Sequence, residues 1–152
     1  GTLFGKGEVA VILAHQGTTG TDQQSWQPFA QLIAARGFTA LTFDFRGRGQ
    51  SGGTLQTNLL VYDVNAAIRF LRGRGYSKII GMGACMGGTA CARAALDNDL
   101  AGLVVVASPM SNGAPNEVTP EVLARLTMPK LFVVAEYDSA GLRPDTTKMF
   151  EL

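Results

Sequence analysis

Short apolar runs of strand length alternate along this chain with segments whose apolar residues recur at helical spacing. This alternation is typical of a parallel β-sheet with helices on both faces, because each parallel connection needs a crossover, usually a helix. The runs are nearly continuous in apolar residues, which predicts strands buried on both sides. We therefore expect an α/β fold, a three-layer αβα sandwich whose mostly parallel sheet has about five strands, at residues 9–14, 39–45, 78–81, 102–107 and 130–135.

The helical segments fall between these strands. In the first, Trp26, Phe29 and Ile33 lie at helical spacing, with Ser25 as the expected N-cap and Gly37 as the C-terminal stop. The same spacing predicts helices at residues 61–71, 86–96, 118–126 and 145–152. A length of 152 residues without repeats or a linker predicts a single domain, residues 1–152.

Composition excludes several classes of function. Thirteen basic and twelve acidic residues give a net charge of +1, and no basic block offers a footprint for nucleic acid or an anionic membrane. No apolar run approaches the roughly 18 residues of a membrane span. Cys85 and Cys91 are six residues apart and the chain has one histidine, so neither a metal site nor a disulfide framework is expected. We expect a cytoplasmic protein with a small-molecule substrate and no cofactor.

The most informative stretch is a sharp turn at Cys85, where an apolar strand runs into a helix rich in small residues. Gly83 and Gly87 stand two residues before and after Cys85, as a tight strand-to-helix turn requires. The turn would present the sulfur at a helix N-terminus, where the dipole and free N–H groups favour the thiolate. The Met86 N–H would then face a developing oxyanion.

This stretch resembles the nucleophile elbow of the α/β-hydrolase superfamily, G-x-nucleophile-x-G, and within it the dienelactone-hydrolase-like branch, whose nucleophile is cysteine. The resemblance extends over most of the chain: Gln16 and Gly17, after His15, look like the HG oxyanion loop, and residues 44–51 look like the family's D-x-R-G-x-G-x-S turn. It implies a hydrolase of a small ester, thioester or lactone. Cys85 would be the nucleophile, and the backbone N–H groups of Met86 and of Gln16 or Gly17 would bind the oxyanion.

The resemblance also implies a triad acid and a histidine. Asp138 is similar in position to the acid that orients the histidine, with Glu136 as the alternative. The family takes its histidine from a loop beyond one further strand, whereas this chain ends at Leu152 and contains only His15. We expect His15 to close a strand and hold the oxyanion loop, and the domain to be a C-terminally incomplete hydrolase core without a triad histidine.

Two expectations follow from the family's strand order. Residues 39–45 and 130–135 would form two strongly apolar sheet edges, which predicts a homodimer or a missing C-terminal segment that covers the edge.

The alternative to an enzyme is a catalytically inactive, incomplete hydrolase fold that serves binding or assembly. A dinucleotide site at Gly47, Gly49 and Gly52 is disfavoured, because no helix follows these glycines directly.

Overall fold

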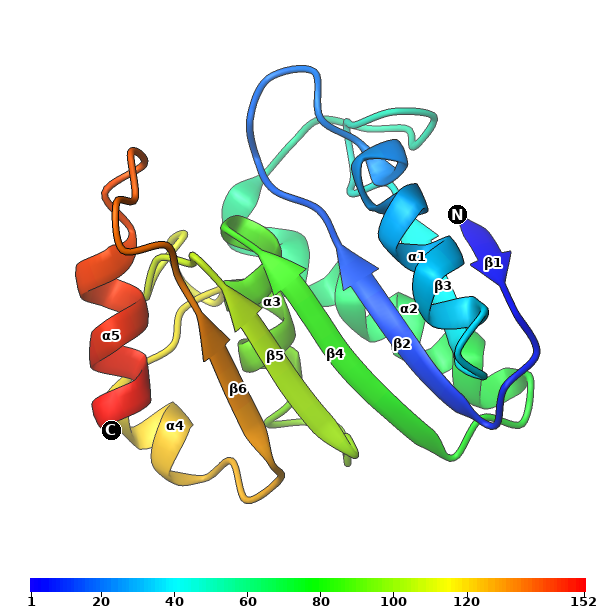
Figure 1. The fold of residues 1–152 in the computed structure, drawn as a ribbon. Coiled ribbons are helices and arrows are strands. Elements are labelled where there is room, and N and C mark those ends of the chain that lie inside the picture. Colours follow the sequence, from blue (N-terminus) through cyan, green and yellow to red (C-terminus); the bar gives the residue numbers. More distant parts are fainter.

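A twisted six-stranded sheet lies between two layers of helices in the computed structural model, which describes residues 1–152 (Figure 1). The strand order is β1-β3-β2-β4-β5-β6, and every pair is parallel except β1 with β3. The predicted α/β class and mostly parallel sheet are therefore confirmed. The strands are β1 (Thr2–Phe4), β2 (Val9–Ala14), β3 (Thr39–Phe43), β4 (Lys78–Ala84), β5 (Gly102–Val106) and β6 (Lys130–Val133).

The helices divide unequally between the two faces of the sheet. One face carries α1 (Gln27–Ala34), which follows the 3-10 turn η1 (Gln23–Trp26). The other face is covered by α2 (Leu60–Gly73), which follows the 3-10 turn η2 (Thr57–Leu59), and by α3 (Met86–Ala94), α4 (Pro120–Ala124) and α5 (Arg143–Glu151). None of these helices has the length and hydropathy needed to span a bilayer.

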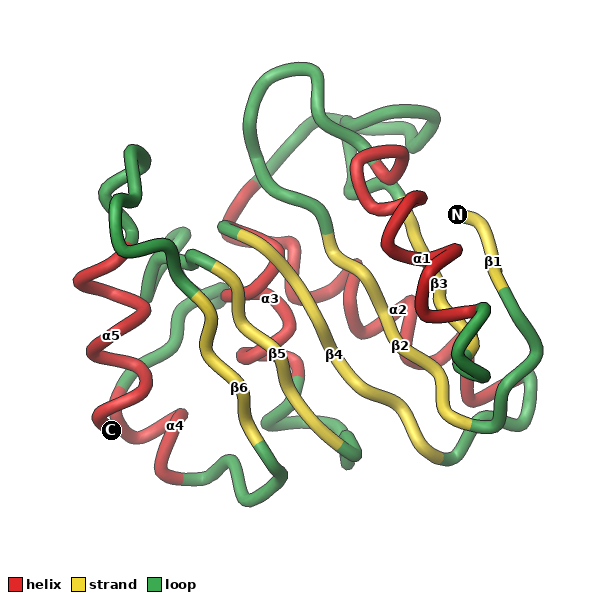
Figure 2. The backbone as a smooth tube through the Cα atoms, in the orientation of Figure 1, coloured by secondary structure: helices red, strands yellow, loops and turns green.

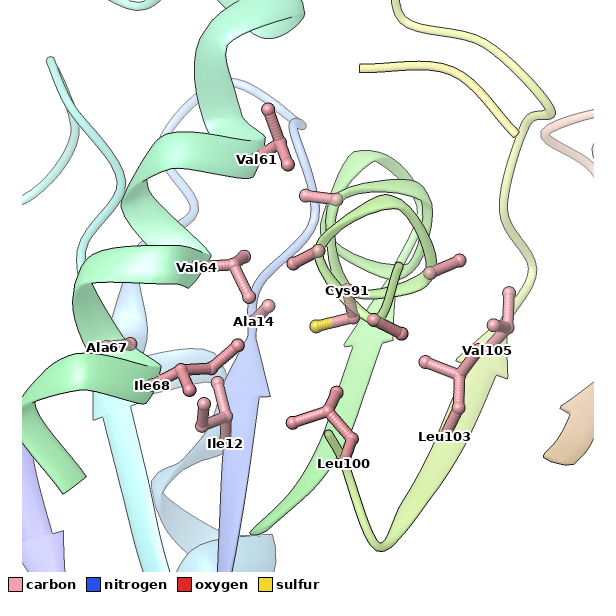
Figure 3. Close-up of a cluster of buried hydrophobic side chains, with 14 of the residues drawn as sticks. Ile12, Ala14, Val61, Val64, Ala67, Ile68, Cys91, Leu100, Leu103 and Val105 are labelled. Carbon is pink, nitrogen blue, oxygen red and sulfur yellow. The ribbon is translucent and has the colours of Figure 1, made fainter. Parts of the chain in front are cut away.

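The larger core lies between the sheet and the helices α2 and α3 (Figure 3). Successive residues of a strand point to opposite faces, so Ile12 enters this core while Val11 and Leu13 face α1. Small residues fill the first turns of α3 and let it approach the sheet closely, with Cys91 fully buried against the strands. The helix that follows the Cys85 turn is thus one of the most buried in the molecule.

Two predictions about the N-terminal third are wrong. The run 39–45 is not a sheet edge, because the short strand β1 pairs antiparallel with β3, with Thr2 opposite Thr42. Three residues of mixed polarity carry too little periodicity to predict such a strand. The first helical segment is capped by Asp22, whose carboxylate accepts the Gln24 N–H at 2.8 Å, and not by Ser25.

Strand ends also differ from the predicted bounds. β4 continues past Gly81 to Ala84, because Gly83 is paired on both sides, with Ala14 of β2 and Val105 of β5. Strands β3 and β6 end two residues early, at Phe43 and Val133. β6 is an edge, as predicted. All parallel strands end at one rim, above which the loops after β2 and β3 rise side by side (Figure 2).

Candidate functional site

Cys85 forms the turn between β4 and α3 at the rim where the parallel strands end. Its φ of 52° and ψ of −126° lie in a region that side chains rarely adopt, and the surrounding structure must hold it there. The Cys85 N–H donates to the Val106 carbonyl at 3.0 Å, and its own carbonyl accepts the Gly88 N–H at 3.0 Å. The predicted sequence of strand, tight turn and helix is thus present, and the half-buried Cys85 is the N-cap residue of α3.

Close backbone contacts explain the glycines around the turn. A Cβ on Gly83 would lie 2.4 Å from the Gly87 carbonyl carbon and oxygen, so strand and helix meet without a side chain between them. A Cβ on Gly87 would lie 2.4 Å from the Ala14 carbonyl oxygen and 2.7 Å from that of His15. These backbone atoms have no room to move, which makes glycine necessary at both positions.

The loop after β2 is held beside this turn by three side chains. The Gln16 carbonyl oxygen is 2.7 Å from His15 Nδ1 and accepts the Thr21 hydroxyl at 2.8 Å, while the Gly17 carbonyl accepts from Arg48 Nη2 at 2.9 Å. A Cβ on Gly17 would lie 2.8 Å from Met86 Sδ, so this loop packs directly on the residue after Cys85. Both carbonyls are engaged by hydrogen bonds, which fixes the orientation of the peptide groups that join residues 16–17 and 17–18.

His15 is fully buried, and both of its ring nitrogens are occupied. Nε2 accepts the Phe45 N–H at 3.3 Å, which places the ring proton on Nδ1, where it is donated to the Gln16 carbonyl. Burial lowers the pKa of His15 below 6.5, although the hydrogen bond to Gln16 acts in the opposite direction. A neutral histidine in this position ties the ends of β2 and β3 together and has no free nitrogen to act as a base.

Asp44 organises the loop that follows β3. Its carboxylate accepts the Gln23 N–H at 2.8 Å, the Gln23 side-chain amide at 3.1 Å and the Gln50 N–H at 3.0 Å. Burial acts against the charged form, but these hydrogen bonds hold the pKa of Asp44 below its ordinary value. Arg46, two residues on, is paired with Asp63 of α2 at 2.7 Å. The D-x-R-G-x-G-x-S residues therefore act as scaffold for the rim.

Asp138 lies in the loop between β6 and α5, at the same rim as Cys85 but beyond the intervening strand β5. All the hydrogen-bond partners of its carboxylate are backbone N–H groups of the same loop: Ala140 at 3.2 Å, Arg143 at 2.9 Å, and Leu142. No hydrogen bond joins Asp138 to Cys85 or His15. The Glu136 carboxylate is exposed and forms no hydrogen bond, while the backbone carbonyl of Glu136 accepts from Arg143.

Cys91 contrasts with Cys85. It is fully buried in the core, and burial raises the pKa of its thiol to about 12 (Figure 3). Neither cysteine is in a disulfide. No group of three or more His, Cys, Asp or Glu side chains is placed to hold a metal ion.

One cavity lies away from the Cys85 turn. It has a volume of about 650 Å³ and is lined by β1, β3 and α2, including Leu3, Phe43 and Phe70. A second cavity of about 430 Å³ lies in the loop that contains Asp138. Neither is lined by Cys85, so the chemistry of the turn, rather than a deep cavity, marks the candidate site.

Comparison with known proteins assigns the family. The sequence profile described as "Alpha/beta hydrolase family" matches residues 11–151, nearly the whole chain. This protein belongs to the alpha/beta hydrolase family. A search of curated proteins found no match.

Several solved structures share the fold. An alpha/beta hydrolase from Sphaerobacter thermophilus is 16% identical with a TM-score of 0.77, over 99% of this chain and 83% of its own. The protein ATU1826 from Agrobacterium tumefaciens is 20% identical with a TM-score of 0.78, over 96% and 68%. A monoacylglycerol lipase from Paleococcus ferrophilus is 20% identical with a TM-score of 0.61, and 81% of this chain covers 47% of that enzyme. The chain thus spans about half the length of that lipase.

The site residues that the sequence predicts are Cys85, Met86, Gln16, Gly17 and Asp138. The structure brings the first four together at the ends of β2 and β4, whereas Asp138 remains separate and caps its own loop. Two residues that hold the Gln16–Gly17 backbone, Thr21 and Arg48, were missed. Arg48 occupies a variable position of the D-x-R-G-x-G-x-S pattern, so no signal in one sequence could have identified it.

Proposed function

We propose that this alpha/beta hydrolase domain transfers the acyl group of a small ester, thioester or lactone to Cys85. The observation that carries the proposal is the strained backbone of Cys85 at the N-cap of α3. Gly83 and Gly87 flank this turn, and a side chain at either position would clash with backbone atoms. A strained, partly exposed residue at a helix N-terminus is typical of an activated nucleophile. The resemblance to the cysteine-using, dienelactone-hydrolase-like branch supports the choice of chemistry.

In the first step the Cys85 thiolate attacks the carbonyl carbon, and a C–S bond forms while the carbonyl π electrons move to oxygen. The N–H groups of Met86 and of Gln16 or Gly17 would stabilise this oxyanion, and one such donor contributes roughly 3 kcal/mol in related sites. Collapse of the intermediate breaks the bond to the leaving alcohol or thiol, which takes up a proton. The products are a thioester on Cys85 and the released alcohol or thiol; with a lactone the ring opens and the new hydroxyl stays on the acyl group.

Hydrolysis of this thioester requires a base that activates water. His15 is not that base, because both of its nitrogens are engaged. Asp138, with Glu136 as the alternative, is proposed as the acid that would orient a triad histidine, and this histidine is not among the 152 residues of the sequence. In the structure the Asp138 carboxylate caps the loop before α5. The second candidate function is binding or assembly without turnover. It is supported by His15, the one histidine of the sequence, because both of its ring nitrogens are engaged.

Acyl-enzyme trapping distinguishes these functions. The protein is incubated with p-nitrophenyl acetate or an acetyl thioester and its intact mass is measured, followed by peptide mapping. We expect one acetyl adduct on Cys85 in the wild-type chain, no adduct in Cys85→Ala, and an undiminished adduct in the matched control Cys91→Ala, whose thiol is buried. An adduct that persists in Cys85→Ala would refute the nucleophile, and no adduct at all would favour the binding function.

A further inference from the structure

A groove separate from the Cys85 turn runs between helix α2 and the strands β1 and β3, with a volume of about 650 Å³. Its helix wall consists of residues that recur at helical spacing along one side of α2: Asp63, Ala66, Ala67, Phe70 and Arg74. A helix rises 1.5 Å per residue, so the groove follows α2 for about 16 Å between Asp63 and Arg74. It is therefore long and narrow.

The middle of the groove is apolar and is not filled by the side chains of the protein. Its strand wall is formed by three apolar residues, Leu3, Leu41 and Phe43. Opposite this wall stand Ala66 and Ala67, whose methyl groups are too short to fill the space, and Phe70 is 41% exposed. An unfilled apolar cavity with a few polar groups at its ends is typical of small-molecule sites.

The two ends of the groove differ in charge. At the rim of the sheet, Arg46 is paired with Asp63 at 2.7 Å, and the Asp44 carboxylate is engaged by N–H donors. At the opposite end the Arg74 guanidinium lies over the Phe70 ring, 4.0 Å from its centroid. Arg74 belongs to neither ion pair of the chain. It is thus the cation of the groove that lacks an anionic partner.

Arg74 also lines a neighbouring hollow of about 400 Å³ at the end of the sheet opposite Cys85. Lys6, before β2, and Lys78, at the start of β4, line the same hollow and form no ion pair, and the only acid there is Glu8. The dipole of α2 favours Arg74 at its C-terminus, but it does not account for lysines from two other elements. Three cations against one carboxylate make this end of the groove electropositive.

We propose that the groove binds a fatty carboxylate, with the alkyl chain along Phe43 and Ala66 and the carboxylate at Arg74. A guanidinium donates parallel hydrogen bonds to a carboxylate, and it can do so while it remains stacked on Phe70. Contact of the alkyl chain with the apolar walls removes hydrocarbon surface from water. The site is independent of the proposed acyl transfer, because no residue of the Cys85 turn lines it.

Isothermal titration calorimetry with octanoate and octanol tests the two parts of the site, because these probes share an alkyl chain and differ in charge. Octanoate should bind more tightly than octanol, and only octanoate should lose affinity as the salt concentration rises. This comparison needs no variant. Equal affinities for the two probes, a salt-independent affinity for octanoate, or no binding of octanoate would overturn the proposal.

Two pairs of variants locate the ligand. Arg74→Gln should weaken octanoate binding about tenfold and leave octanol unaffected, whereas Arg69→Gln removes an exposed charge of α2 outside the groove and should change neither. Ala66→Leu should weaken both probes by filling the groove, whereas Ala124→Leu, at an exposed alanine of α4, should not. Equal octanoate affinities within either pair would refute the site.

An anionic membrane presents the same chemistry, an alkyl chain that ends in a negative charge. Cosedimentation with phosphatidylglycerol vesicles distinguishes this source from a free carboxylate. We expect octanoate binding in solution and no retention of the chain on the vesicles. If the vesicles retain the wild-type chain and not Arg74→Gln, the cations serve a membrane surface, and the proposal of a free carboxylate ligand falls.

Discussion

His15 lies beside the proposed nucleophile turn, but hydrogen bonds engage both of its ring nitrogens. It ends strand β2, is fully buried, packs edge-on against the Phe45 ring at 5.0 Å between centroids, and bridges the Phe45 N–H and the Gln16 carbonyl. A charged imidazolium here would lose the acceptor role of Nε2 and would be buried without an acidic partner. The residue therefore contributes to folding in its neutral form.

This role predicts a pH dependence of stability. The pKa of His15 in the folded chain lies below 6.5, the value expected in the unfolded chain. At a pH between these two pKa values only the unfolded chain takes up a proton at this residue. The contribution of His15 to the free energy of unfolding is fully present above about pH 7. It falls as the pH drops towards about 5, by at most about 1.4 kcal/mol per pH unit. Urea unfolding between pH 7.5 and 5 measures the slope.

The matched variant is His15→Gln, which should be less stable overall but show a shallower slope. Asp44 does not complicate this range, because its pKa is lowered and its contribution is lost only below about pH 4. Equal slopes in the two chains, or a flat wild-type profile, would contradict the assignment of a neutral buried His15.

The sequence predicts residues of the site where a pattern is local, and fails where the contact joins two loops. Gly83, Cys85 and Gly87 form one pattern within five residues, and the backbone contacts of the turn explain each of them. Arg48 and Gly17 are 31 residues apart, and their contact depends on how the loops after β2 and β3 rise together above the sheet. No spacing rule encodes such a contact.

At the level of elements, Asp138 acts on helix α5. The first turn of a helix leaves backbone N–H groups without partners, and the Asp138 carboxylate accepts those of Leu142 and Arg143 before and at the start of α5. A carboxylate at this end is also favoured by the helix dipole. The proposed acid thus has a structural role that any mutational test of activity must separate from chemistry.

We expect Asp138→Ala to destabilise the chain by about 1–2 kcal/mol, since it removes the cap of α5 and leaves N–H groups unpaired. Asp138→Asn keeps one acceptor oxygen and should lose less. Urea unfolding gives the free energies, and amide exchange at Leu142 and Arg143 reports the local effect. Glu136→Ala is the control, because its carboxylate is exposed and has no hydrogen bond; equal losses in Glu136→Ala and Asp138→Ala would disprove the cap.

The elements missed from the sequence share a cause, which is that pairing decided them rather than pattern. β1 has three residues and is a strand only because it pairs with β3. The glycines at positions 81 and 83 predict that β4 ends early, yet pairing with β2 and β5 on its two sides keeps the strand extended to Ala84. The long amphipathic helix α2 and the apolar strand β2, in contrast, follow from their own residues.

In the whole molecule the two faces of the sheet are unequally covered. Four helices lie on one face, whereas α1 alone lies on the other and packs over β2 and β3. On that second face the register places Leu131 beside Val104 and Val133 beside Val106. Leu131 is 56% exposed and Val133 is 43% exposed, at a strand edge that pairs with no other strand. Exposed apolar surface on an open edge favours association.

The isolated chain is therefore expected to self-associate as its concentration rises, and sedimentation velocity over a concentration series measures this. Replacing Leu131 and Val133 together by threonine retains strand propensity and removes apolar surface, so it should shift the equilibrium towards monomer.

The matched control is Leu32→Thr, which removes an exposed leucine (48%) from α1 and should leave association unchanged. A wild-type chain that stays monomeric at every concentration, or an equal shift in the Leu32 control, would show that the open β6 edge does not drive assembly. Because Cys85 lies at the rim and not on this face, acyl adduct formation should be the same in the double variant and the wild-type chain, which separates assembly from the proposed chemistry.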